Sequence, residues 1–119
     1  MVTRRGRGEL ESEVMAALWA AEGPMTTSGV QSVLGGGLAY NTVQTILTRL
    51  LEKGVVRRAP AGRGHAYWPV QDAATTAASR MRAALDGRPD RRAVLQQFAA
   101  GLDPDDASTL RSLLDERSP

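Results

Sequence analysis

A short run of polar residues between positions 41 and 49 has the chemistry needed to contact the edges of DNA bases. Its members offer amide, hydroxyl and guanidinium groups: Asn41, Thr42, Thr45, Thr48 and Arg49. An asparagine can pair with adenine, a threonine methyl can contact the thymine methyl, and an arginine suits guanine or a phosphate. We therefore interpret these side chains as candidate DNA contacts.

A helix over residues 40–53 must position these side chains. Its apolar residues have the i, i+3, i+4, i+7 spacing that gathers them on one side of a helix: Val43, Ile46, Leu47 and Leu50. The polar residues fall on the opposite side, and Gly54 supplies a stop signal. The segment predicts a helix with a buried apolar face and an outward polar face.

A basic hairpin is predicted directly after this helix. Residues 55–58 and 65–68 are rich in β-branched and aromatic side chains, and residues 59–64 between them have the Pro and Gly content of a hairpin tip. Strand alternation would turn Val56 and one of the aromatic pair Tyr67-Trp68 inward. The hairpin carries three arginines that are placed to meet phosphates or enter a minor groove: Arg57, Arg58 and Arg63.

Two further helices are expected before residue 40. Apolar spacing predicts a first helix over residues 9–22 and a shorter one before the glycine triplet at residues 35–37. Three helices followed by a hairpin make a winged helix-turn-helix, here over residues 9–70. A flexible basic arm is expected at residues 1–8.

Positive charge is concentrated in the segment that holds the helix and the hairpin. Residues 1–70 carry eight Arg and Lys against five Glu, a net charge of +3, whereas residues 71–119 carry seven against eight acids, a net charge of −1. A basic segment that coincides with a helix and a hairpin favours a polyanion partner, here double-stranded DNA. A solvated charged face would have the same composition.

Composition argues against several other classes of protein. The 119 residues include no cysteine and a single histidine, His65, so we expect no disulfide framework, no Cys/His metal site and no cofactor. No residue is singled out as catalytic, and we do not expect an enzyme. No apolar run approaches the ~18 residues of a membrane span, and no signal peptide is recognisable, so a cytoplasmic protein is expected.

Residues 71–119 are predicted to form three helices that act as a dimerisation domain. Asp72 and the Asp103-Pro104 pair are predicted helix starts. So short a segment, with few large apolar side chains, buries little surface alone. We therefore expect a homodimer through eight apolar side chains: Met81, Leu85, Val94, Leu95, Phe98, Leu110, Leu113 and Leu114. The alternative is that the tail folds back on its own winged helix.

Four segments of the chain, in the same order, resemble the BlaI/MecI penicillinase-repressor family: GELESEVMAALW, LAYNTVQTILTRLLEKGVVRR, GRGHAYWPV and LQQFAAGLDPDDASTLRSLL. The resemblance covers nearly the whole chain after Gly8. It implies a dimeric winged-helix repressor that binds inverted-repeat operators. It also implies operator contacts at Asn41, Thr42, Thr45 and Arg49.

The same resemblance implies that the repressor is released by proteolysis in its tail. In that family induction typically relies on a membrane metallopeptidase sensor, whose action leads to cleavage of the repressor. The matching bond is Gln97–Phe98, where Gln97 stands in place of the Asn of the best-known members.

Two other functions fit the sequence. The winged helix could be a protein-interaction module whose basic patch docks an acidic partner. The chain could also be a small-molecule-responsive regulator of the MarR kind. Enrichment of one palindromic sequence from genomic DNA would favour a repressor over the interaction module, and a ligand-dependent change in operator affinity would favour the MarR-like regulator.

Overall fold

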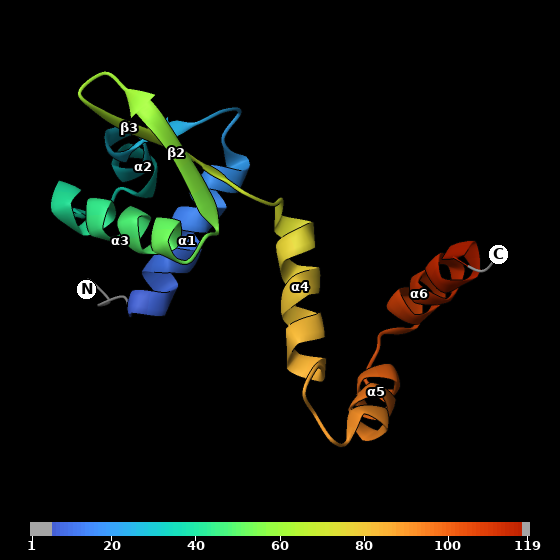
Figure 1. The fold of residues 1–119 in the computed structure, drawn as a ribbon. Helices are drawn as coiled ribbons and strands as arrows, with labels where there is room; N and C mark the ends of the chain where they lie inside the picture. The colour runs from blue at the N-terminus through green and yellow to red at the C-terminus, as the bar shows by residue number, and fades with distance from the viewer. Residues whose placement is uncertain (1–5, 118–119) are drawn as a thin grey trace. The chain divides into compact units, whose positions relative to one another are not determined.

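The computed structural model describes residues 6–117, which divide into two compact units (Figure 1). The boundary between the units lies between Thr76 and Ala77. Of the predicted basic arm, residues 1–5 lie outside the described residues. The fold is mainly α-helical with a small β-sheet, which confirms the fold class predicted from the sequence.

Three helices begin the N-terminal unit: α1 (Arg7–Ala20), α2 (Thr27–Leu34) and α3 (Tyr40–Glu52). Helix α1 begins and ends two residues earlier than predicted, so its first residues belong to the predicted arm. Thr26 caps α2, because its hydroxyl accepts a hydrogen bond from the Gly29 N–H at 3.1 Å. Helix α3 agrees with its predicted bounds to within one residue.

A three-stranded antiparallel sheet completes this unit, in the order β1–β3–β2. Its strands are β1 (Met25–Thr26), β2 (Val56–Ala61) and β3 (Gly64–Pro69). Strands β2 and β3 form the predicted hairpin but extend further, so the tip is only Gly62 and Arg63. Gly62 has a φ of 59°, which favours glycine. Strand β1 is not predicted from the sequence, because two residues are too few to show alternation.

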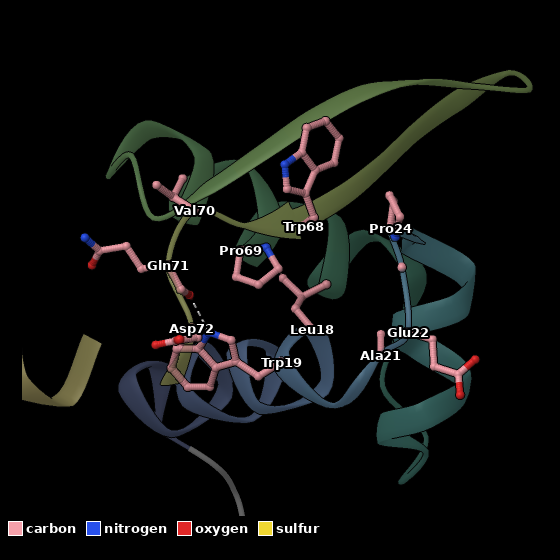
Figure 2. A pocket seen from close by; sticks show the side chains of 11 residues that line it. Leu18, Trp19, Ala21, Glu22, Pro24, Trp68, Pro69, Val70, Gln71 and Asp72 are labelled. Carbon is pink, nitrogen blue, oxygen red and sulfur yellow. Dashed lines mark hydrogen bonds between the residues drawn. The ribbon is translucent and has the colours of Figure 1, made fainter. Parts of the chain in front are cut away.

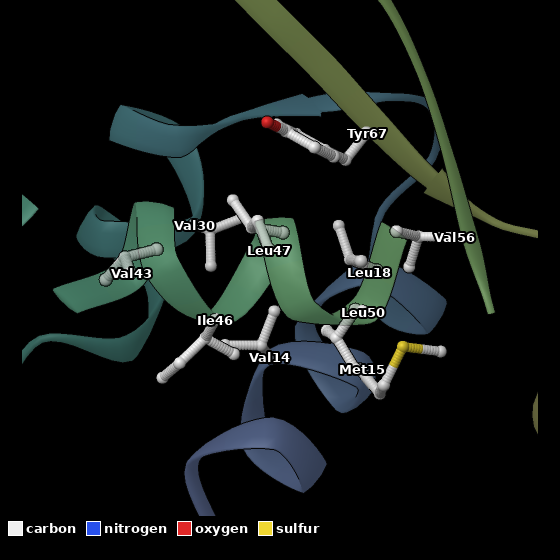
Figure 3. Close-up of a cluster of buried hydrophobic side chains, with 10 residues drawn as sticks. All are labelled: Val14, Met15, Leu18, Val30, Val43, Ile46, Leu47, Leu50, Val56 and Tyr67. Atoms are coloured by element: carbon white, nitrogen blue, oxygen red, sulfur yellow. The ribbon is translucent and has the colours of Figure 1, made fainter. Parts of the chain in front are cut away.

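The core of the N-terminal unit lies between the three helices and the inner face of the hairpin (Figure 3). The predicted apolar face of α3 is fully used there, since all four of its members are buried: Val43, Ile46, Leu47 and Leu50. Of the two adjacent aromatic residues in β3, Tyr67 turns inward with Val56, whereas Trp68 is half-buried. Burying the apolar face of α3 leaves its polar face outside.

The C-terminal part of the chain also forms three helices: α4 (Ala73–Leu85), α5 (Arg91–Ala100) and α6 (Pro104–Arg117). The predicted helix starts are present, because Asp72 accepts from the Thr75 N–H at 2.7 Å and Asp103 accepts from the Asp105 N–H at 2.8 Å. None of the three helices has a buried residue. Among the described residues, no helix is long and apolar enough to cross a membrane.

Candidate nucleic-acid interface

The outward face of α3 presents the predicted base-contacting residues. Asn41, Thr42 and Thr45 are exposed, whereas Thr48 and Arg49 are half-buried at its edge. The Thr45 hydroxyl donates to the Asn41 carbonyl oxygen at 2.8 Å. Because that bond uses the hydroxyl proton, Thr45 offers a base its methyl group and an oxygen acceptor.

The start of α3 has the features of an anion-binding helix terminus. Its N-cap residue, Ala39, makes no side-chain capping bond, and the Thr42 and Val43 N–H groups both donate to the Ala39 carbonyl. The N–H groups at the very start of the helix therefore have no side-chain partner, and the helix dipole favours a negative group there. At the other end, Lys53 pairs with Glu11 of α1 at 2.7 Å, which ties α3 to α1.

The wing formed by β2 and β3 displays its arginines on different surfaces. In the strand register Arg57 lies opposite Trp68, and Arg58 lies opposite Tyr67. Because side chains alternate between faces, Arg58 lies on the same face as the buried Tyr67, whereas Arg57 lies on the other. Arg63 is exposed at the tip. The predicted phosphate contacts thus occupy both faces and the tip of the wing.

Sequence reasoning missed a partly buried hydrogen-bond network beneath this surface. The Thr27 hydroxyl donates to Gln44 Oε1 at 2.7 Å, and Gln44 Nε2 donates to the Tyr67 hydroxyl at 3.0 Å. Gln44 Nε2 also lies 3.4 Å from the hydroxyl of Thr48, which itself donates to the Gln44 carbonyl at 2.9 Å. The network joins α2, α3 and β3, and Thr48 supports it from the edge of the polar face.

A separate cavity of about 510 Å³ lies at the end of α1, beside the chain that leaves the hairpin (Figure 2). Both tryptophans of the chain line it, and Figure 2 shows Leu18 and Pro69 between their rings. The Trp19 indole N–H donates to the Gln71 carbonyl oxygen at 2.9 Å. The charged side chains of the lining are two acids, Glu22 and Asp72. This cavity is therefore unsuited to bind nucleic acid.

Most of the predicted dimer residues are exposed on the C-terminal helices. Six of the eight are exposed, and their side chains are large: Met81, Leu95, Phe98, Leu110, Leu113 and Leu114. The other two, Leu85 and Val94, are half-buried. A hollow of about 320 Å³ is lined by residues of α4 and α5. Among the described residues, no group of three or more His, Cys, Asp or Glu is arranged to hold a metal ion.

Three helices with an exposed polar face on the third, followed by a two-stranded wing, define the winged-helix class. The model of the penicillinase repressor family matches residues 7–116, and the chain belongs to that family. It is similar to the transcriptional regulator BlaI from two strains of Mycobacterium tuberculosis. Each is 37% identical over 114 residues, which cover 92% of this chain and 83% of the relative. The protein is thus a transcriptional repressor.

The chain is also similar to two solved structures of regulators. A MarR family regulator from Silicibacter pomeroyi is 16% identical, with a TM-score of 0.48, and the match covers 90% of this chain and 67% of that one. The oxidised form of MarR from E. coli is 23% identical, with a TM-score of 0.40, and the match covers 95% and 74%.

Proposed function

We propose that the protein binds an inverted-repeat operator as a homodimer, with α3 of each copy in the major groove of one half-site. The observation that carries this proposal is the exposed polar face of α3 beside the arginines of the wing. An α-helix fits the major groove, where base edges are distinguishable, and the wing then lies along the neighbouring backbone.

The residues of this surface divide into two roles. Asn41, Thr42 and Thr45 face the bases, with the Asn41 amide suited to adenine and the Thr45 methyl to thymine. Arg49 at the edge contacts a guanine or a phosphate. The wing arginines and the start of α3 hold the phosphate backbone, which sets the position of the protein but does not read sequence.

Dimerisation through the C-terminal helices follows from their uncovered apolar surface. Exposed Leu and Phe side chains on neighbouring helices are costly in water, and a second copy can cover them. A dimer with two-fold symmetry places its two copies of α3 about one helical turn of DNA apart, or about 10 base pairs. The operator should then be a palindrome with that half-site spacing.

Selection of bound fragments from the source genome tests the proposal. The expected result is enrichment of one palindromic sequence, confirmed by gel shifts in which a scrambled duplex of equal length binds far more weakly. Equal binding to both duplexes would contradict sequence-specific repression. No binding to either duplex would favour the protein-interaction module.

Release from DNA by proteolysis is supported by the resemblance at Gln97–Phe98. This bond lies inside α5, so the helix must open locally before a protease can bind it in extended form. We propose that a membrane metallopeptidase sensor starts this step indirectly. Mass spectrometry of the chain after induction should then show a fragment that ends at Gln97, and an intact chain would contradict it.

A response to a small molecule is a second candidate function, supported by the cavity at Trp19 and Trp68. Its volume suits a small ligand, and its acids favour a cation over an anion. Since both tryptophans line it, benzyltrimethylammonium should change the tryptophan fluorescence saturably and alter operator affinity, whereas phenylacetate should not. The absence of any saturable change with the cation would remove this candidate.

A further inference from the structure

The hydroxyl of Tyr67 lies between the helix proposed to face the bases and an arginine of the wing. It accepts a hydrogen bond from Gln44 Nε2 at 3.0 Å and one from Arg58 Nη1 at 3.5 Å. The first is a bond of ordinary length, and the second is long. Tyr67 is 0% exposed, so it is placed to connect these groups and not to touch DNA itself.

The strand register makes this connection specific to one arginine. Arg58 is the cross-strand partner of Tyr67, and the two side chains lie on the same face of the hairpin. Arg57 and its partner Trp68 lie on the opposite face. The hairpin therefore contains one arginine that is tied to the network and, next to it, one that is not.

The network behind Tyr67 is fixed from the other side as well. The Gln44 amide accepts from the Thr27 hydroxyl at 2.7 Å, and Thr27 is 3% exposed at the start of α2. A half-buried amide whose oxygen and nitrogen are both bonded has one preferred orientation. The position of the Tyr67 hydroxyl relative to α3 is thus set by two well-formed hydrogen bonds.

We infer that Tyr67 is a positioning residue for DNA binding, which holds the Arg58 guanidinium at a fixed place relative to α3. An arginine side chain has several rotatable bonds, and ordering it only when DNA arrives would cost affinity. Because Arg58 is already ordered before DNA binds, its phosphate contact at the wing and the base contacts at α3 form together. This inference rests on the proposed DNA binding.

Tyr67→Phe tests the inference by removing one oxygen while keeping the ring in the core. We expect a roughly two- to tenfold weaker operator affinity, the range for ordering one long side chain on binding. The comparison variant is Thr27→Val, which removes only the Thr27 bond to Gln44 and keeps the contacts of the Tyr67 hydroxyl with both Gln44 and Arg58. It should lower thermal stability as Tyr67→Phe does, yet change operator affinity less.

A double-mutant cycle with Arg58→Ala separates positioning from a structural role. If Tyr67 acts through Arg58, the substitution Tyr67→Phe should cost little further affinity once Arg58→Ala is present. Fully additive losses would overturn the inference. Operator binding by the unchanged chain, together with an unchanged affinity for Tyr67→Phe, would also overturn it while leaving the proposed function intact. No selective binding by the unchanged chain would overturn both.

Side-chain order in the unchanged protein gives an independent test that needs no variant of Tyr67. NMR order parameters of the arginine Nε–H groups should be higher for Arg58 than for Arg57, because Arg58 alone contacts the Tyr67 hydroxyl. Equal mobility of the two side chains in the free protein would contradict the inference.

Discussion

The two units differ in what they do with their large apolar side chains. The N-terminal unit buries Val14, Leu47, Tyr67 and other apolar side chains in one core, whereas the C-terminal helices leave Phe98, Leu113 and other large side chains exposed. Burial of apolar surface is the main favourable term in folding. The first unit therefore has its own source of stability, whereas the exposed apolar side chains of the second unit contribute little to the stability of that unit.

This difference assigns separate tasks to the units. A rigid core keeps the polar face of α3 and the wing in fixed geometry, as recognition of base edges requires. An uncovered apolar surface instead suits association between copies. The repressor thus has one unit that is proposed to contact DNA and another that is proposed to bring two such units together.

The largest contrast should appear when a leucine is truncated in each unit. Leu47→Ala removes a side chain that is 0% exposed and should lower the free energy of unfolding by about 3–5 kcal/mol. Leu113→Ala, at 49% exposure, should change it by less than about 0.5 kcal/mol in samples dilute enough to be monomeric. Denaturant unfolding measures both, and similar losses would show that the tail has a core of its own.

Formation of the proposed dimer should be sensitive to a charge placed on an exposed side chain of the C-terminal helices. Phe98→Asp places a carboxylate in the proposed dimer surface and should weaken dimerisation at least about a hundredfold, about 2.7 kcal/mol. Arg92→Ala on the same helix is the control. Sedimentation equilibrium measures the change. A dimer that survives Phe98→Asp would place the interface elsewhere.

The proposed base contacts can be tested with a pair of changes at Thr45. Thr45→Ala should weaken operator binding by ~1–3 kcal/mol, whereas Thr45→Val keeps a methyl group and should lose less. Gel shifts on operator and scrambled duplexes separate a role in base recognition from a role in positioning the protein. Equal losses on both duplexes would mean that Thr45 only positions the protein.

The wing tip should affect binding without affecting specificity. Arg63→Ala should reduce the slope of log affinity against log salt concentration by about one and weaken operator and scrambled duplexes alike. Fluorescence anisotropy at several salt concentrations measures the slope. A selective loss on the operator would assign Arg63 to base recognition.

The smallest expected effect concerns Asp72 at the start of α4. Hydrogen bonds from Thr75 hold the pKa of this carboxyl below its usual range. Its stabilising contribution is therefore present above the ordinary pKa and is lost as the pH falls through the lowered one. An NMR titration of the Asp72 carboxyl should have its midpoint below that of an unstructured aspartate, and a midpoint at or above it would contradict the cap.

Much of the first unit could be predicted from the sequence, because its elements follow simple periodicities. The spacing of the apolar residues predicted α3. The alternation of side chains along the strand predicted that one of two aromatic residues, Tyr67 or Trp68, turns into the core. The hydrogen bonds of Gln44 could not be predicted, since they depend on which of these two turns inward and on the placement of Thr27. Strand β1 could not be predicted either, because its pairing with β3 is a long-range contact.

The second unit shows another limit of prediction from the sequence of one chain. Asp72 and Asp103 predicted two helix starts correctly, because capping is a local property of the chain. In the proposed dimer Phe98 and Leu113 are covered by a second molecule, which periodicity within one chain does not describe. The proposed dimer residues therefore stay a prediction.

The stoichiometry of the complex with DNA tests the central claim most directly. Native mass spectrometry of the chain with a duplex that contains the selected palindrome should give two copies of the 12.7 kDa chain per duplex. Phe98→Asp should lower the affinity for that duplex while leaving the winged-helix unit folded. A single copy bound to the full palindrome, with no loss of affinity in Phe98→Asp, would contradict the division of tasks between the two units.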